Sequence, residues 1–287
     1  MANVRDFRTR IRSVRSTQQI TRAMKLVAAS KLRRAQERIL AARPYARKML
    51  EVLSSLAARA GADKHPLLAR RPEERVVVVV ITADKGLCGG FNTNILNRAR
   101  QFLDGLAGRD VKVDIVGRKA RDWFRRRDYH ARRVLIDLFR NITPEQGREI
   151  ASDLVRGFTA AEFDAVHLVY NEFKSAIQQR VVVEPLLPIP RAALVAEGAT
   201  PAEDYIYEPD DATLFAALLP RHVEIQVFHA LLESNAAEQG ARMSAMDNAT
   251  RNAGEMIETL TLQMNKIRQA SITKEILEVV SGAEALR

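Results

Sequence analysis

The sequence predicts a long antiparallel coiled coil, formed by N- and C-terminal helices, together with a central Rossmann-like α/β domain. Apolar residues repeat with a heptad period at both ends of the chain. Between these ends, β-branched runs alternate with helical patterns, which is typical of a mostly parallel sheet. We therefore expect one coiled-coil helix over 1–60, an α/β domain over 61–208 and a second coiled-coil helix over 209–287.

The N-terminal helix is predicted from an apolar register that begins at Val4 and is still in phase at Leu56. A seam sustained at 3.5-residue spacing indicates a coiled coil rather than a helix lying on a globular core. Three positions of this register are not apolar, namely Gln18, Thr21 and Lys25.

The central domain is predicted from strand and helix patterns that alternate along the chain. The run Val76–Ile81 consists entirely of apolar, β-branched residues, as in a strand that is buried on both faces. Thr143 can cap a helix whose first turn contains Pro144. Pro220 is expected to break the helical segment near the end of this region. We also expect strands at 111–116, 165–170 and 181–187, and helical segments at 92–106 and 118–127.

The C-terminal helix carries a second apolar register, which runs from Ile225 to Leu277 and includes Met256. Beyond Ile267, a further apolar stripe lies out of phase with this seam. A two-helix rod has nothing within the chain to bury such a stripe, and exposed apolar stripes mark partner surfaces. The stripe consists of Ile272, Ile276, Val279 and Ala283. Ile20, Met24 and Val27 leave the first register in a similar way, although an irregular supercoil explains them as well.

Positive charge is concentrated in the first helix. Residues 1–60 contain 15 Lys and Arg but only 3 Asp and Glu, whereas residues 221–287 contain 7 and 9. The second helix therefore cannot neutralise the first. We expect an acidic surface outside this chain to meet the basic helix, and the alternative is a solvated face that keeps the helices soluble.

The composition argues against several kinds of site. The single cysteine, Cys88, excludes a disulfide framework and a C-x-x-C zinc or redox site, and the five histidines lack the spacing of a helical metal site. The loop Asp84–Gly90 contains glycines but matches neither phosphate-binding pattern, so a tight turn is favoured there. No apolar run approaches the ~20 residues that span a bilayer. We expect no metal and no cofactor.

Several long motifs resemble the γ subunit of the rotary proton-translocating ATP synthase, of the bacterial type. They lie in both helices and at the first strand and loop of the central domain. Residues 108–200 resemble that family in layout and length more than in sequence. The matching segments are 12–33, 84–90, 205–209, 241–250, 268–276 and 280–283.

The resemblance implies a central rotor shaft without catalytic activity of its own. Its coiled coil would fill the bore of a ring of α and β subunits, and its α/β foot would bind the ε subunit and the c-subunit ring. Rotation would present different faces of the shaft to successive β subunits and shift their nucleotide affinity. The resemblance also implies a peripheral location at the cytoplasmic face of the bacterial inner membrane, with no transmembrane span and no nucleic acid partner.

The resemblance further assigns roles to particular residues. Those that would contact the αβ ring are Met24, Lys25, Arg242, Gln269, Thr273 and Glu275. Those that would form an apolar bearing tip are Ile276, Val279, Val280, Ala283 and Leu286. Those on the foot that would face the c ring and the ε subunit are Tyr205 and Glu208.

Two other functions compete with the rotor. A nucleotide-dependent α/β enzyme would use the central domain, but it would leave both long helices unexplained. A basic coiled-coil protein that binds nucleic acid would use residues 1–60, but only Phe7 and Tyr45 supply aromatic side chains there.

Overall fold

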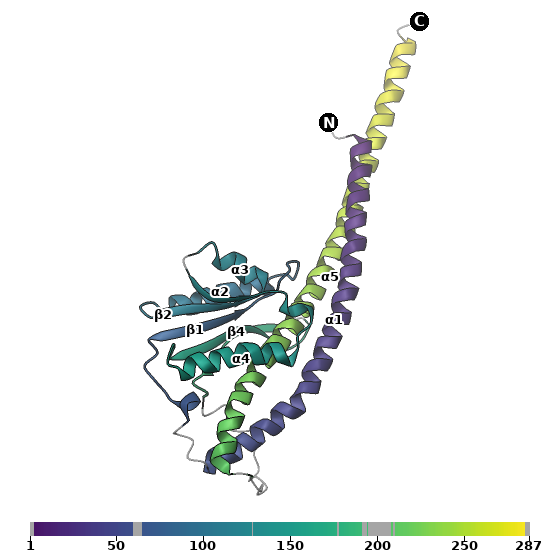
Figure 1. The fold of residues 1–287 in the computed structure, drawn as a ribbon. Coiled ribbons are helices and arrows are strands. Elements are labelled where there is room, and N and C mark those ends of the chain that lie inside the picture. The colour runs from purple at the N-terminus through teal and green to yellow at the C-terminus, as the bar shows by residue number, and fades with distance from the viewer. Residues whose placement is uncertain are drawn as a thin grey trace. The chain divides into compact units, whose positions relative to one another are not determined.

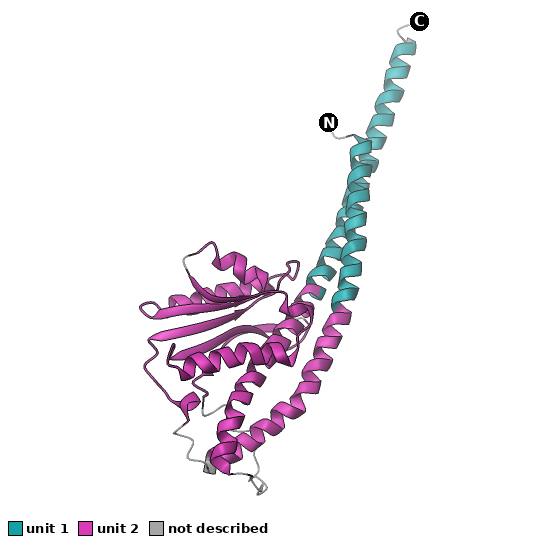
Figure 2. Cartoon of the chain, viewed as in Figure 1, with its two compact units in different colours: residues 1–28, 243–287 teal, residues 29–242 magenta. Residues whose placement is uncertain are grey.

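The computed structural model describes residues 3–59, 65–127, 129–176, 178–190, 194, 208 and 210–284. Two long helices and a five-stranded sheet with its own helices make up the fold (Figure 1). The chain divides into two compact units (Figure 2). The first contains residues 1–28 and 243–287, and the second contains residues 29–242.

Both predicted long helices are confirmed. Helix α1 runs from Val4 to Arg59 over 56 residues, and helix α5 runs from Asp211 to Glu284 over 74 residues. In the first unit the two helices are antiparallel, because contacts pair Lys25 with Asp247 and Thr21 with Thr250. The coiled-coil arrangement expected from the two registers is therefore present in this unit (Figure 2).

The register predicted for α1 matches the buried face of that helix. Every register position from Val4 to Leu56 is buried or half-buried, including the polar Gln18, Thr21 and Lys25. The helix therefore does not rotate to follow its apolar residues over this stretch, and Ile20 remains exposed.

The register predicted for α5 is wrong at Met256 and at its last member Leu277, which are 53% and 60% exposed. The seam passes through Thr250 and Ile257 as well as the predicted Ala253, and all three are buried or half-buried. Thr250 belongs to the seam because it forms a hydrogen bond with Thr21 of α1. A register drawn through apolar residues alone misses the polar Thr250 and wrongly includes Met256, although its other members Ala253, Leu260 and Ile267 are buried or half-buried.

The predicted break at Pro220 is also wrong, because α5 continues through this residue. A proline inside a helix removes one hydrogen bond and costs about 3 kcal/mol. Here the flanking turns are held by packing, since Phe215, Leu219 and Val223 are buried. Most helix stability in proteins comes from such packing rather than from propensity, which explains why the helix persists.

The central domain has one five-stranded sheet in the order β3-β2-β1-β4-β5, in which only β5 is antiparallel to its neighbour. The predicted α/β domain with a mostly parallel sheet is thus confirmed. The strands are β1 (Arg75–Ile81), β2 (Asp110–Val116), β3 (His130–Leu135), β4 (Ala165–Phe173) and β5 (Gln179–Leu187). The helices are α2 (Phe91–Asp104), α3 (Arg118–Phe124) and α4 (Pro144–Thr159), with short 3-10 turns η2 (Pro66–Leu68) and η3 (Leu138–Arg140).

The core of this domain is built on strand β1, which is buried from Val76 to Ile81. Its alternate residues Val76, Val78 and Val80 pack in one cluster with apolar residues of α2 and α3. Helix α4 covers the opposite face of the sheet (Figure 1). The predicted cap of α4 is confirmed, because Thr143 and Gln146 form a reciprocal capping box. No helix among the residues described has both the length and the apolar character needed to cross a membrane.

Candidate interaction surfaces

The end of α5 carries exposed apolar residues and has no partner helix beside it among the described residues. The register of the helical pair places Val4 opposite about residue 267, since the two helices run antiparallel at equal rise. From Arg268 to Ala283, every residue is exposed. This stretch includes large apolar side chains, with Val279 72% exposed. The others are Ile272, Ile276, Leu277 and Val280.

The structure places four of the five residues predicted for the bearing tip on this exposed helix end. Ile276, Val279, Val280 and Ala283 all lie in α5 beyond the last α1 contact. Leu286 lies outside the described residues. A partner that covers this segment would gain about 25 cal/mol for each Å² of apolar surface removed from water.

The residues predicted to contact the ring fall into two groups. Gln269, Thr273 and Glu275 are exposed on the same end of α5. Met24 and Lys25 are half-buried in the helical pair, where the Lys25 ammonium lies 2.6 Å from Asp247. The sixth residue, Arg242, lies in the second unit and is treated below.

The polar seam positions of α1 find polar partners on α5. Thr250 and Thr21 join their hydroxyls at 2.8 Å, and Gln18 Nε2 donates to the carbonyl of Thr250 at 3.4 Å. The polar interruption is therefore satisfied within the pair. Of the three apolar residues predicted to leave the seam, Ile20 and Val27 are exposed and Met24 is half-buried. Leu26 beside them is exposed as well, so this side of the pair has apolar surface that a partner could cover.

The basic face of α1 is mostly unneutralised. Arg33 pairs with Glu37 on the same helix, but Arg8, Arg12 and Arg34 form no ion pair with any residue that the structure describes. This face can attract an acidic surface at a range of about 8 Å in physiological salt.

Arg242 is largely buried in the second unit, with 12% of its side chain exposed. Its Nη1 lies 2.7 Å from Glu238 Oε1, one turn earlier on α5, and its Nη2 donates to the carbonyl oxygen of Gly86 at 3.1 Å. Burial raises the pKa of Glu238, and the nearby Arg242 opposes that rise. Sequence reasoning assigned Arg242 to a partner and missed these contacts within the chain.

The loop Asp84–Gly90 is tied into the domain by its own polar groups. Asp84 Oδ1 accepts the N–H groups of Arg118 and Asp137, each at 3.1 Å, and so joins the loops that follow β1, β2 and β3. Asn92 Oδ1 accepts the N–H of Ala83 at 3.0 Å. Asp84 and Asn92 therefore have a structural role, which is to hold this loop in the domain, and phosphate binding is not needed to explain them.

Cys88 is buried at this turn, and burial raises the pKa of its thiol. A thiol held neutral is a poor nucleophile. In the residues that the structure covers, no three His, Cys, Asp or Glu side chains gather where they could hold a metal ion. Cys88 therefore packs as a small residue in the turn.

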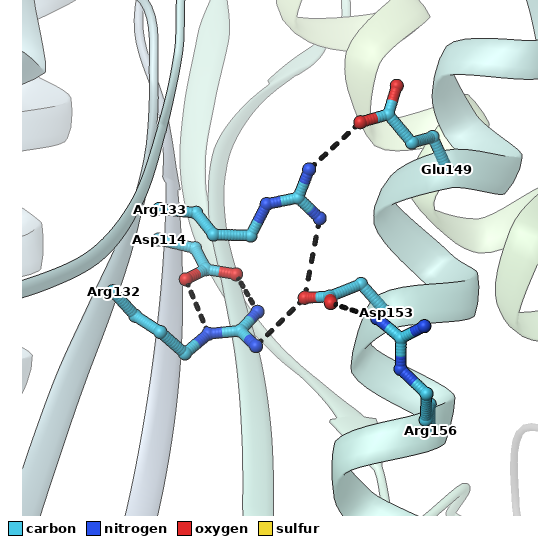
Figure 3. A network of polar contacts seen from close by, with 6 residues as sticks. All are labelled: Asp114, Arg132, Arg133, Glu149, Asp153 and Arg156. Atoms are coloured by element: carbon cyan, nitrogen blue, oxygen red, sulfur yellow. Dashed lines mark hydrogen bonds and ion pairs between the residues drawn. The ribbon is translucent and has the colours of Figure 1, made fainter.

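An ion-pair network centred on the buried Asp114 links the edge strand β3 to β2 and α4, and sequence reasoning did not find it (Figure 3). Arg132 binds the carboxylate of Asp114 through two nitrogens and lies 2.8 Å from Asp153 Oδ2. Arg133 Nη1 approaches the same Asp153 oxygen at 3.3 Å. Neighbouring strand residues face opposite sides unless a bulge intervenes, and the register does shift between Val113 and Asp114. Glu149 and Arg156 complete the network.

The two foot residues are only partly placed. Glu208 is exposed. Tyr205 lies outside the described residues. The expectation that both face other subunits therefore remains a prediction.

Comparisons with known proteins agree with the fold and with the motifs. The family model described as ATP synthase matches residues 3–286. The ATP synthase gamma chain of Anaeromyxobacter sp. (strain Fw109-5) is 52% identical over 292 residues, covering 100% of both chains. A chain from the Tetrahymena thermophila mitochondrial ATP synthase central stalk and c-ring structure is 30% identical, with a TM-score of 0.60, over 80% of this chain and 99% of that one. A chain from the Euglena gracilis mitochondrial ATP synthase has the same fold, with a TM-score of 0.68 at 19% identity, over 99% of this chain and 94% of that one.

Proposed function

This chain belongs to the family of ATP synthase gamma chains, and we propose that it couples proton flow through the membrane ring to ATP synthesis or hydrolysis by rotating as the central stalk. The subunit is structural and has no catalytic activity of its own. The coupling would arise from differential contact, because each face of the shaft stabilises a different state of the surrounding nucleotide sites.

The exposed apolar end of α5 is the single observation that carries the proposal. A free helix with Ile276, Leu277, Val279 and Val280 exposed would be unfavourable in water if it remained uncovered. A sleeve formed by the α and β subunits would bury it. Ile276, Val279, Val280, Ala283 and Leu286 would then act as the bearing.

The polar contacts with the ring would come from residues just before the tip and from the helical pair. Gln269, Thr273 and Glu275 are exposed there and have side chains able to bind polar groups of β. Met24 and Lys25 would meet a moving part of β, and Arg242 would contribute through the small part of its side chain that remains exposed. The basic face of α1 would meet acidic segments of β.

The foot is proposed to bind the ε subunit and the c ring, with Tyr205 and Glu208 on the surface that faces them. Such a subunit would be peripheral to the cytoplasmic face of the bacterial inner membrane. The Tetrahymena structure, which is of a mitochondrial central stalk together with a c-ring, supports the proposed contact of the foot with the c ring.

The proposal is tested by labelling a cysteine at the tip in the free and in the assembled chain. In Ala283→Cys the thiol is exposed in the free chain and should react with a maleimide at once, whereas in the complex it should be protected. Ala107→Cys, in an exposed turn of the central domain, is the matched control, and the native Cys88 is already buried.

Equal labelling of position 283 in the free and assembled chain would contradict the sleeve. A second readout is independent of labelling. The tagged chain, purified from membranes, should bring with it a nucleotide-hydrolysing ring and show no such activity when isolated. A nucleotide-dependent enzyme would instead be active alone.

A further inference from the structure

The sheet of the central domain has a topological switch point between β1 and β4. The chain moves from β1 outwards to β2 and β3, and then returns to the other side of β1 as β4. In open α/β sheets, the crevice outside the carboxyl ends of two such strands is the usual place for a ligand. In this protein, α5 lies at that place.

On the β1 side, the contact comes from Arg242. Its guanidinium donates to the carbonyl of Gly86, in the loop that follows β1, at 3.1 Å. Glu238 holds the same guanidinium at 2.7 Å and is itself 4% exposed. The contact is therefore a charge-assisted bond with a buried counter-ion, which is stronger than a neutral surface bond.

On the β4 side, the contact comes from Glu233, which is buried. Val169 is the last residue of β4 that pairs with β1, and strand β4 continues beyond it as far as Phe173. The N–H of Phe173 donates to Glu233 Oε2 at 2.9 Å. Beyond the end of the parallel ladder with β1, this carboxylate on α5 therefore accepts a backbone hydrogen bond from β4. The histidine one turn earlier, His229, lies 3.4 Å from the other carboxylate oxygen.

Two glycines allow α5 and the domain to approach this closely. A Cβ built on Gly240 would lie 3.3 Å from the carbonyl oxygen of Ala176 and 3.4 Å from its Cα, in the connection between β4 and β5. A Cβ built on Gly147, in α4, would lie 2.9 Å from the Cβ of Phe228 on α5. The helix therefore touches the connections on both sides of the switch point.

We infer that α5 occupies the switch-point crevice in place of a ligand, and that Glu233 and Arg242 are positioning residues which hold the α/β domain to the rotor helix as one body. Torque between that domain and the rest of α5 would pass through these two contacts. This inference rests on the proposed rotor function, and it adds the joint at which the foot is fixed to the helix.

The test uses the chain assembled in ATP synthase and reconstituted in vesicles. In Glu233→Ala the Phe173 N–H loses its partner, and protons pumped per ATP hydrolysed should fall severalfold. Glu233→Gln keeps a carbonyl oxygen that can accept the same N–H, so it should pump nearly as the parent chain does. Arg242→Met should lower the pumping ratio as well, because methionine can bind neither Gly86 nor Glu238.

A disulfide supplies the rescue. Ala176→Cys with Gly240→Cys would join the two elements covalently where their backbones already lie in contact. Oxidation should restore pumping to the Glu233→Ala chain, and reduction should remove it again. In the parent background, oxidation should leave pumping at the level of the same pair in its reduced state, since the two elements are proposed to move together.

Hydrogen exchange on the isolated chain separates this joint from general damage to the fold. In Glu233→Ala, the amides of 229–242 and of Phe173 should exchange about tenfold faster while β1 and β2 keep their protection. The inference is overturned if Glu233→Ala and Arg242→Met pump at the full ratio, or if oxidising the cysteine pair in the parent background stops the pumping that the reduced pair supports. A failure of the rotor proposal looks different, because the unmodified chain would then neither assemble with a nucleotide-hydrolysing ring nor support pumping.

Discussion

Thr21 and Thr250 face each other across the helical pair, with their hydroxyl oxygens 2.8 Å apart. One hydroxyl donates to the other, and the remaining proton goes to a carbonyl of its own helix, either Gln18 or Met246. The hydroxyl groups of these two seam residues thus find their hydrogen-bond partners within the helical pair. A polar residue in an apolar seam fixes the register of a coiled coil at some cost in stability.

Replacing both threonines by valine tests this register role. Thr21→Val alone and Thr250→Val alone should each lower the free energy of unfolding by about 1 kcal/mol, since each leaves a part-buried hydroxyl without its partner. The double variant should lose less than the sum, with a coupling of about 0.5–1.5 kcal/mol measured by urea unfolding. Strict additivity would show that the two hydroxyls do not interact.

Gly147→Ala should destabilise the central domain. The new methyl group would lie 2.9 Å from the Cβ of Phe228, so α4 or α5 must shift at a cost of about 1–3 kcal/mol. Gly282→Ala is the matched control, because nothing lies within 4 Å of a Cβ there. The control should be neutral or gain up to about 1 kcal/mol from better helix propensity. Equal thermal midpoints for the two variants would contradict the close packing.

His222 should make stability depend on pH. Burial lowers the pKa of this side chain to about 4, against 6.5 as its ordinary value. Above pH 6.5 both the folded and the unfolded chain hold it neutral. As the pH falls from 6.5 towards 4, only the unfolded chain binds the proton, so stability is lost, by up to about 3 kcal/mol.

The variant His222→Leu should remove this slope. Urea unfolding of the parent chain and of the variant would be compared at pH 7.5, 5.5 and 4.5. The difference between them should change steadily in favour of the variant as the pH falls. A constant difference would mean that the histidine titrates alike in both states.

The apolar tip should matter for assembly but not for the isolated fold. Ile276→Asp and Val279→Asp change side chains that are already exposed, so the unfolding free energy should stay within about 0.5 kcal/mol. The assembled complex should form more weakly, because a charge would enter an apolar sleeve. Thr273→Asp would not serve as a control, since Thr273 is itself a proposed contact. Glu255→Gln, earlier on α5, serves instead.

The basic face of α1 should act in the same direction through charge. Neutralising Arg8, Arg12 and Arg34 together should leave the isolated chain folded, since none has an ion-pair partner among the described residues. It should weaken assembly or coupling in a manner that added salt partly mimics. If the triple variant assembles and couples at low salt as well as the parent chain does, the basic face does not bind an acidic surface.

Regular periodicity explains why so much of the fold could be predicted. The α1 register and the run Val76–Ile81 specify their elements through spacing alone, and both are confirmed. Strand β3 was missed because it is a short, Arg-rich edge strand with a bulge, and its pairing depends on Asp114 and α4 rather than on its own pattern. The sequence of β3 alone does not indicate these partners, which lie elsewhere in the chain.

For the candidate surfaces, too, local patterns could be predicted and contacts between distant residues could not. The exposed tip follows from a stripe that is out of phase with its neighbours, so the sequence predicts it. The contacts of Arg242 with Gly86 and of Glu233 with Phe173 join residues that are 156 and 60 positions apart, and only the folded chain brings them together. Met256 was placed wrongly because the seam of α5 passes through a threonine, which an apolar pattern ignores.

The bulge at Arg132 has a consequence for the open side of the sheet. An edge strand offers unpaired backbone groups to any other strand, and charged side chains and bulges are the usual defences against that. Here both defences coincide, since the irregular stretch of β3 carries two arginines committed to α4. Together they would disfavour edge-to-edge pairing, and so aggregation, of newly made chains that have not yet met their partners.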